Sequence, residues 1–171
     1  MYSTVQPFII SDSEATYHQC YNHITRTLKQ LLDTPVKTTY HIGGTRHFNY
    51  QTEPILDILV GVNNLHDITA LDEKRLNYEN FYRLHHHYKK KVVMAQFNNL
   101  IDLKQQTRLH IIQRDSDLYN QYLAMDDALE HNQYIIQQFE QQKLELTQTT
   151  HTIRDYENGK QQIFAHLYQQ L

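Results

Sequence analysis

The sequence predicts an α+β protein, in which a mixed β-sheet is covered by helices and the C-terminal third is helical. Two observations predict this class. Apolar residues recur at intervals of three and four near the start of the chain and through its last third, which is the period of an amphipathic helix. Between these regions, apolar and polar residues alternate or the chain runs continuously apolar, which is typical of half-buried and buried strands.

The first helix is expected over residues 13–32, with N-cap candidates just before it and a proline at position 35 just after it. Its apolar stripe comprises Tyr17, Tyr21, Ile24, Leu28 and Leu31. Residues 36–42 alternate and predict a half-buried strand that leads into a diglycine turn, Gly43-Gly44. Residues 55–62 predict an interior strand covered on both faces, in which Asp57 is the one charged residue and shares a face with Leu59.

The middle of the chain predicts one short helix and three strands. Residues 63–76 are expected to form the helix, with a buried side made of Leu65, Ile68 and Leu71 or Leu76. Residues 81–87 and 92–97 are expected to form two strands joined by a basic hairpin tip at 88–91. Residues 107–113 predict a further strand, with Leu109 facing one way and Arg108 and His110 the other.

Three helices are expected after this strand. The first starts at Asp115 or Ser116 and carries an apolar stripe of Leu118, Tyr122, Met125 and Leu129. A glutamine-rich helix with Ile135, Ile136, Phe139 and Leu146 on its apolar side follows. The last helix begins near residue 153 and places Tyr156, Lys160 and Ile163 on one stripe.

Length and composition bound the class of protein. A chain of 171 residues predicts a single domain, residues 1–171, with a sizeable core. The net charge of −3 argues against a broad nucleic-acid-binding face. The single cysteine, Cys20, cannot form an intramolecular disulfide, which fits a reducing compartment. No signal peptide is apparent and no apolar run approaches the ~20 residues of a membrane helix, so we expect a cytoplasmic protein without membrane contact.

The diglycine turn and Asp57 form the first candidate site. Glycines allow positive φ and close approach of a ligand, and successive N–H groups in such a turn can bind an anion. A carboxylate inside an apolar strand requires a cation, a metal ion or a hydrogen-bond donor. Together they suggest a phosphate and metal site, although a tight turn and a structural carboxylate would explain each feature alone.

At these residues the sequence resembles the GrpB family, a branch of the nucleotidyltransferase-like fold. The family form is His-Ile-Gly-Ser-Thr, then a loop ending in Lys-Pro, then Ile-Ile-Asp-Ile. The positions that match it here are His41, Ile42, Gly43, Thr45, Pro54, Ile55, Asp57 and Ile58. The resemblance continues downstream, at Leu109-His110-Ile111 and at Tyr156 with Lys160. It implies a nucleotidyltransferase-like mixed sheet and a pocket for a nucleotide or another phosphorylated small molecule.

The resemblance also implies the chemistry and shows where this chain departs from it. Nucleotidyltransferases hold two divalent cations between paired carboxylates and phosphates. Asp57 would be the catalytic carboxylate and would hold Mg²⁺ or Mn²⁺, but Leu59 stands where the second carboxylate would be. Glu53 replaces the family lysine, so that Arg46 or His47 would have to supply a cation from the loop, or Glu53 would itself be the second metal ligand.

The predicted ligand-binding residues are therefore His41, Gly43, Gly44, Thr45, Arg46, Arg108, His110 and Lys160. Lys160 lies on an apolar helix stripe, where a lysine either extends its head to solvent or reaches an anionic ligand. His41 and His110 would equally suit a structural role. Two alternatives stay open: a non-catalytic module that binds a phosphate ligand or a partner through the same pocket, and a transition-metal site on His85 and His87. The sequence does not predict the oligomeric state.

Overall fold

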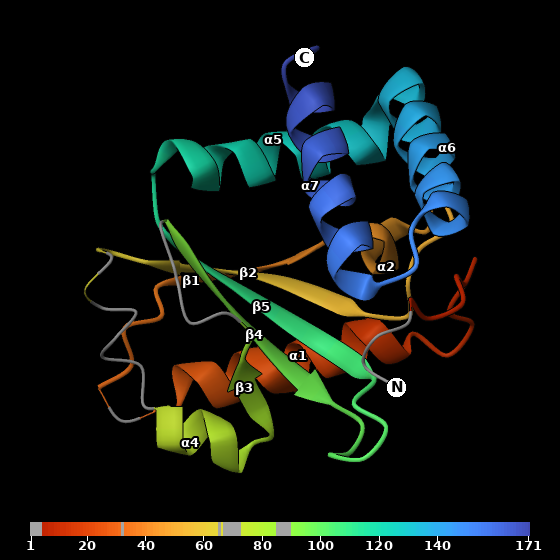
Figure 1. Cartoon of the computed structure of the whole chain (residues 1–171). Helices are drawn as coiled ribbons and strands as arrows, with labels where there is room; N and C mark the ends of the chain where they lie inside the picture. The colour runs from red at the N-terminus through yellow and green to blue at the C-terminus, as the bar shows by residue number, and fades with distance from the viewer. Residues whose placement is uncertain (1–4, 32, 65, 67–72, 85–89) are drawn as a thin grey trace.

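The structure is a computed structural model that describes residues 5–31, 33–64, 66, 73–84 and 90–171. Its centre is a five-stranded sheet in the order β1-β2-β5-β4-β3, flanked by helices on both faces (Figure 1). β2 and β5 are parallel, whereas the β1–β2, β4–β5 and β3–β4 pairs are antiparallel. The predicted α+β class with a mixed sheet and a helical C-terminal part is confirmed.

The strands are shorter or longer than predicted by a few residues at their ends. β1 spans Thr38–Ile42, β2 spans Leu56–Val62 and β5 spans Gln105–Gln113. β3 spans Phe81–Arg83 and is shorter than the predicted strand 81–87, of which residues 85–87 lie outside the described residues. β4 spans Lys91–Phe97, so Lys91 belongs to a strand and not to the predicted hairpin tip. Residues 88 and 89 of that tip are also outside the described part.

The helices form two layers. Helix α1 (Thr16–Lys29) lies under one face of the sheet with the short helix α4 (Glu73–Tyr78) beside it (Figure 1). Helices α5 (Asp117–His131), α6 (Gln133–Thr149) and α7 (Ile153–Tyr168) lie over the other face, and a single turn of helix, α2 (Gly44–His47), follows β1. The helix predicted over 63–76 is described only in part: α4 begins at residue 73, and the predicted Leu76 is buried.

Each of the longer helices begins where the sequence supplies a side-chain acceptor. Asp12 accepts from the backbone N–H of Tyr17 at 2.9 Å in front of α1. Ser116, Asn132 and Thr152 are the N-caps of α5, α6 and α7, and each accepts from the N–H three residues later. These bonds satisfy N–H groups that the helix itself leaves free, which explains why the helices begin there.

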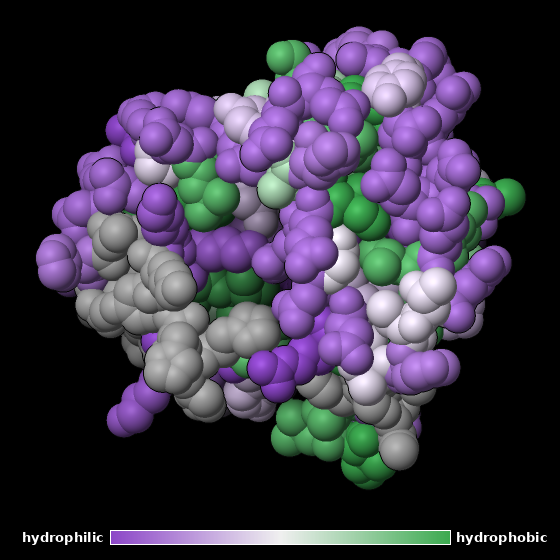
Figure 2. All heavy atoms as spheres, turned by 45° about the horizontal axis from the view of Figure 1, so that its top comes forward, coloured by the Kyte–Doolittle hydropathy of each residue, from purple (hydrophilic) through white to green (hydrophobic). Residues whose placement is uncertain are grey.

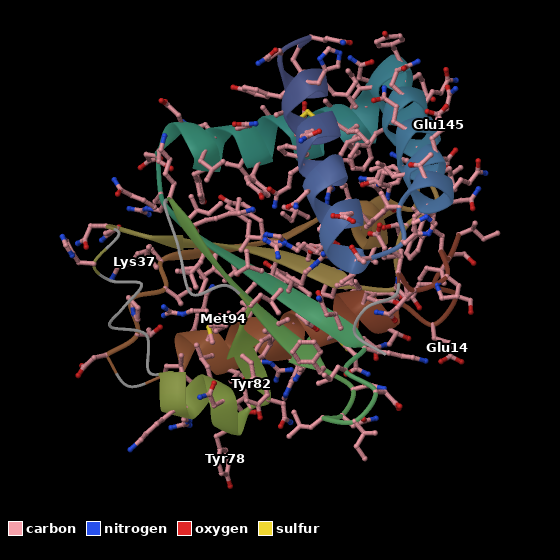
Figure 3. All side chains as sticks on the ribbon, viewed as in Figure 1. Glu14, Lys37, Tyr78, Tyr82, Met94 and Glu145 are labelled. Atoms are coloured by element: carbon pink, nitrogen blue, oxygen red, sulfur yellow. The ribbon has the colours of Figure 1, made fainter. Side chains whose placement is uncertain are left out.

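The face of the sheet under α1 holds the apolar core. The stripe predicted for α1 packs on it, with Ile24, Leu28 and Leu31 buried and Tyr17 and Tyr21 partly buried. The strands contribute alternate residues: Leu56, Ile58, Val60 and Val62 from β2, Val92 and Met94 from β4, and Leu109 and Ile111 from β5. Met94 is enclosed in this layer, whereas Tyr78 at the end of α4 points into solvent (Figure 3).

The opposite face is less uniformly apolar. A second cluster joins Tyr50 to buried residues of α5, α6 and α7, and a smaller third cluster holds Ile42, Leu59, Ile112 and Tyr119. The outer surface over these helices is mostly hydrophilic, with hydrophobic side chains visible mainly in the furrows between helices (Figure 2). Within the described residues, none of the helices has the length and apolar character needed to span a bilayer.

Candidate functional site

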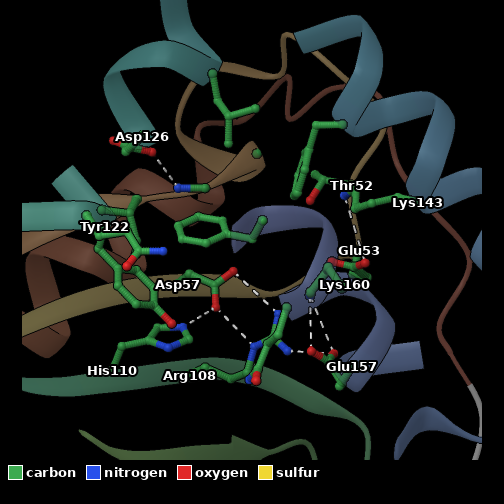
Figure 4. A pocket seen from close by; sticks show the side chains of 18 of the residues that line it. Thr52, Glu53, Asp57, Arg108, His110, Tyr122, Asp126, Lys143, Glu157 and Lys160 are labelled. Atoms are coloured by element: carbon green, nitrogen blue, oxygen red, sulfur yellow. Dashed lines mark hydrogen bonds and ion pairs between the residues drawn. The ribbon is translucent and has the colours of Figure 1, made fainter. Parts of the chain in front are cut away.

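A cavity of ≈ 310 Å³ lies between the sheet and helices α5, α6 and α7 (Figure 4). Its floor is the β2–β5 pair, and its walls come from the diglycine turn and the three helices. Charged side chains lie among aromatic and aliphatic ones, a mixture typical of small-molecule sites. The charged and imidazole-bearing lining residues are Glu53, Asp57, Lys91, Arg108, His110, Asp126, Lys143, Glu157 and Lys160.

Strand alternation places Asp57 on the floor of this cavity. Its neighbours Leu56 and Ile58 point into the core under α1, so Asp57 and Leu59 point the other way. Asp57 pairs in register with Arg108 of β5, and His110 is the next residue of β5 on the same face. The three polar side chains therefore converge because two adjacent strands run parallel in this register.

Asp57 is held by two donors. Its Oδ1 accepts from Arg108 Nε at 3.0 Å and from His110 Nε2 at 2.8 Å, and Arg108 Nη2 lies 3.5 Å from Oδ2. Burial raises the pKa of Asp57, but the Arg108 guanidinium and the His110 hydrogen bond outweigh it and hold the pKa well below its ordinary value. Burial lowers the pKa of His110, so Asp57 is ionised and His110 is neutral near pH 7.

A second set of ion pairs extends from Arg108 to helix α7. Arg108 Nη1 donates to Glu157 Oε1 at 2.8 Å, and Lys160 Nζ lies 3.2 Å from Glu157 Oε2. Lys160 also lies 3.5 Å from Oε2 of Glu53, whose Oε1 accepts from the Tyr156 hydroxyl. Burial raises the pKa of Glu53, but the nearby lysines and Arg108 lower it to about 2. The loop before β2, strand β5 and helix α7 are thereby joined through charged side chains.

Lys143 of α6 is the most enclosed cation of the cavity, with a side chain 2% exposed. Its Nζ lies 4.8–5.1 Å from the ring centroids of Phe8, Tyr50 and Phe139. Glu53 Oε1 lies 3.9 Å away, which is beyond hydrogen-bond distance. Burial lowers the pKa of Lys143 to about 8, although Glu53 raises it.

The diglycine turn has a backbone conformation that favours glycine, and a carboxylate accepts a hydrogen bond from its N–H. Gly43 has φ +80°, and a Cβ on Gly44 would lie 2.5 Å from the Cβ of Thr52. The N–H of Gly43 donates to Asp126 Oδ1 of α5 at 2.8 Å, and Arg46 Nη2 lies 3.0 Å from Asp126 Oδ2. The anion at this turn is therefore the protein's own Asp126.

The structure brings six predicted site residues to the cavity and directs three elsewhere. The six that line it are Gly43, Gly44, Asp57, Arg108, His110 and Lys160. His41 points to the α1 face, where its ring lies 5.5 Å from that of Tyr21 and its Nε2 lies 3.0 Å from Thr45 Oγ1. Arg46 points to Asp126 and Glu130 of α5. His41 precedes the turn and faces α1 because it is opposite Ile58 in the β1–β2 register, whereas Arg46 belongs to the helical turn α2, which directs it to α5.

Sequence reasoning missed several lining residues. The sequence could have predicted Lys143, because it follows Phe139 by four residues and precedes Leu146 by three. It therefore lies on the apolar stripe of its helix, as Lys160 does. Lys91 was predicted in a basic hairpin tip, but it begins β4 and its Nζ donates to the Tyr122 hydroxyl at 2.7 Å. Asp126 had no local signal, because its role depends on how α5 is rotated over the turn.

The polar groups present do not fit a resident two-metal centre. In the described part of the chain, no group of three or more His, Cys, Asp or Glu side chains is arranged to hold a metal ion. Asp57 already accepts from Arg108 and His110, and the neighbouring position on its face is the buried Leu59. His85 and His87, on which the transition-metal alternative depends, lie outside the described residues.

The sequence matches the model of the GrpB family, described as GrpB protein, over residues 7–170. The Glutamate-rich protein GrpB of Alkalihalophilus pseudofirmus is 28% identical over 153 residues, which is 86% of this chain and 88% of that protein. The crystal structure of conserved protein GrpB from Enterococcus faecalis has the same fold, with a TM-score of 0.71 and 20% identity over 95% of this chain and 98% of that chain. A structure of the Cid1 poly (U) polymerase matches with a TM-score of 0.47 and 14% identity, over 80% of this chain and 45% of that chain.

Proposed function

The chain belongs to the GrpB family, and we propose that its cavity binds a phosphorylated small molecule, such as a nucleotide, without a resident metal ion. The observation that carries this proposal is the convergence on one cavity of three cations, of which Arg108 and Lys143 are buried and Lys160 is partly buried. Arg108 comes from β5, Lys143 from α6 and Lys160 from α7. Holding three cations together with little access to water is costly unless anions meet them, so their position favours an anionic ligand.

The two lysines keep capacity for a ligand oxygen. Hydrogen bonds between ammonium and carboxylate groups are usually ~2.7–2.9 Å long. Lys160 lies 3.2 Å from Glu157 and 3.5 Å from Glu53, and Lys143 lies 3.9 Å from Glu53. An ammonium carries three donors, so a phosphate oxygen could be added here without removing the existing pairs.

The opposing charges limit where the phosphate would bind and how tightly. Glu53, Asp57 and Glu157 balance the three cations, so a phosphate competes with carboxylates and we expect modest affinity. At the diglycine turn a phosphate would have to displace Asp126 from the Gly43 N–H. The proposed phosphate position is therefore on the Lys143–Lys160 side of the cavity, with the aromatic walls facing the rest of the ligand.

The role of Asp57 differs in this proposal from the one that the family resemblance implies. As a catalytic carboxylate it would need Mg²⁺ or Mn²⁺, and that cation would have to bind next to the Arg108 guanidinium, with which Asp57 already pairs. As a positioning residue it fixes Arg108 under the ligand without any metal. The ion-paired arrangement favours binding without nucleotidyl transfer.

The experiment is a calorimetric and thermal-shift screen of nucleotides and other phosphorylated compounds, with and without Mg²⁺ or Mn²⁺. For the compound that binds, Lys160→Gln should weaken binding by roughly tenfold, the loss of one charge-assisted hydrogen bond. Lys29→Gln, which makes the same change on an exposed residue of α1, should leave the affinity unchanged. Equal affinities for both variants, or no binding by any phosphorylated compound, would contradict the proposal.

A turnover assay separates the two roles of Asp57. The proposal predicts no release of pyrophosphate from nucleotides when Mg²⁺ or Mn²⁺ is present. Release that depends on the metal and disappears in Asp57→Asn would instead establish a nucleotidyltransferase.

A further inference from the structure

Lys143 has an environment unlike that of the other cations in the cavity. It continues the apolar stripe of α6 after Ile136 and Phe139, and its Nζ extends to the cavity between α6 and the loop before β2 (Figure 4). Three aromatic rings surround the ammonium. Among the described residues, Glu53 supplies the carboxylate that lies within 4 Å of it. Glu53 is shared, because it also accepts from Tyr156 and lies 3.5 Å from Lys160.

These are the conditions under which a lysine amine becomes a nucleophile. An ammonium is an unreactive species, and removal from water or a neighbouring cation increases the share of free amine. Burial removes Lys143 from water and opposes its charge, as do Lys160 and Arg108, whereas Glu53 and Asp57 favour the charge and do not outweigh burial. Its pKa of about 8 leaves a substantial fraction of free amine in weakly alkaline solution. Lys160 differs, because Glu157 and Glu53 outweigh burial and raise its pKa.

We propose that Lys143 forms a reversible imine with an aldehyde or ketone, and that the phosphate group of this ligand lies against Lys160. The first half depends only on Lys143, and the second half rests on the proposed function. Lys143 and Lys160 approach opposite oxygens of the Glu53 carboxylate, Oε1 and Oε2, so a single ligand could contact both amines. A cavity of ≈ 310 Å³ is at the lower end of the range for small-molecule sites and admits a compact ligand.

The reaction balances without an added oxidant or reductant. The Lys143 ammonium first releases a proton to solvent, and the free amine attacks the carbonyl carbon to form a C–N bond. The carbonyl oxygen then leaves as water together with the two amine hydrogens, so that a C=N bond replaces the C=O bond. The rings of Phe8, Tyr50 and Phe139 limit the access of water, which would reverse the reaction.

The test uses pyridoxal 5′-phosphate, an aromatic aldehyde with a phosphate group, on the full chain. After incubation, borohydride reduces any imine to a stable amine, and peptide mass spectrometry locates it. We expect about tenfold more adduct on Lys143 than on the exposed Lys29 and Lys104, with a labelling rate that rises to half its maximum near pH 8. Adduct on Lys160, or an even distribution over exposed lysines, would overturn the inference.

A variant that removes the Lys143 amine is the next test. Lys143→Arg keeps the charge and should lose the adduct on the α6 peptide while its circular dichroism stays that of the parent. Persistence of the visible imine band at full amplitude in this variant would overturn the inference. Should Lys143→Arg fold poorly, the adduct map of the parent chain decides alone.

Pyridoxal, which lacks the phosphate, separates the inference from the proposed function. Adduct on Lys143 with both aldehydes, without preference for the phosphorylated one, would support the imine and contradict the phosphate site. Binding of nucleotides that depends on Lys160, with no adduct on Lys143 from either aldehyde, would support the proposed function and overturn the imine.

Discussion

The two faces of the sheet are built from the same strands and differ in what they enclose. Under α1, alternate residues of β2 and β5 join a continuous apolar core. Under α5, α6 and α7, the intervening residues Asp57, Arg108 and His110 line a cavity and pair with one another, and Arg108 also pairs with Glu157 of α7. The pair Asp57 and Ile58 shows the contrast most directly, because adjacent residues of β2 belong to opposite faces.

The difference teaches where stability and function lie in this fold. Burial of apolar surface stabilises a protein by ~25 cal/mol per Å², so the α1 face is expected to supply most of the stability. Buried ion pairs often contribute little net free energy, because desolvation of the charges offsets their attraction. The charged face therefore needs another explanation for its composition, and a ligand in the cavity supplies one.

The largest expected effect is on the charged face. Asp57→Ala leaves Arg108 with Glu157 alone and removes the partner of His110, so we expect a loss of roughly 3–5 kcal/mol in the free energy of unfolding. Urea unfolding followed by circular dichroism measures it. The double variant Asp57→Leu, Arg108→Met removes both charges and should recover part of the loss, because Glu157 keeps Lys160 whereas His110 still lacks its acceptor. A double variant as unstable as Asp57→Ala would show that the pair itself stabilises the fold.

On the apolar face, Ile58→Ala should cost roughly 2–5 kcal/mol, because Ile58 is fully buried and its truncation leaves a cavity in the core. It should leave the affinity for a phosphorylated ligand at Lys160 within about twofold, because the Ile58 side chain points into the core under α1, away from the cavity. Calorimetry on the folded fraction checks this. A large loss of affinity in Ile58→Ala would mean that the two faces are coupled and would break the comparison.

The sequence predicted the strands and their facing residues better than the turn. Asp57, Arg108 and His110 were found because the period of two along a strand fixes which side chains share a face. Thr45 and Arg46 were expected at the ligand, but they follow a turn with positive φ at Gly43 that directs them elsewhere; His41 was also expected there, but it faces α1 because it is opposite Ile58 in the strand register. Side-chain direction after such a turn depends on backbone angles that residue types do not specify.

The helical walls were predictable only in part. Lys160 was recognised from its stripe position, and Lys143 had the same signal in α6. Asp126 and Glu157 became site residues through the docking of α5 and α7 on the sheet, which follows from contacts between elements far apart in the sequence. The sequence near each residue thus predicts its position on a helix. It does not predict how the helix is rotated on the sheet, which decides which polar side chains enter the cavity.

The buried histidines and the cavity carboxylate Glu53 should lose their contributions to stability in different pH ranges. Burial lowers the pKa of His41 on the α1 side from 6.5 to about 4, so the unfolded chain binds more protons between these values. The stability linked to His41 is complete above pH 6.5 and falls as the pH drops toward 4, and His47 and His110 act in the same direction. The lowered pKa of Glu53 makes its contribution complete above pH 4.5 and lost toward about pH 2.

Two variants test which residue causes each decline in stability. For each group, the free energy of unfolding should change by at most ~1.4 kcal/mol per pH unit. His41→Gln keeps a hydrogen-bonding partner for Thr45 and should flatten the decline between pH 6.5 and 4. Glu53→Gln should flatten the decline below pH 4.5 and leave the first range as it is. Urea unfolding at a series of pH values measures both, and identical profiles for the parent and the two variants would contradict the assignment.

The smallest expected effect concerns the diglycine turn, at the other end of the charged face from Lys160. Asp126→Asn keeps an oxygen that accepts from the Gly43 N–H and removes the charge that pairs with Arg46, which retains Glu130. Arg46 is partly exposed, so we expect a loss of ~1 kcal/mol or less in the free energy of unfolding and a ligand affinity within about twofold of the parent. The same calorimetric titration used for Lys160→Gln measures it. A tenfold gain in affinity would mean that Asp126 competes with the ligand phosphate for the turn, and would move the phosphate site from the Lys143–Lys160 side to the glycines.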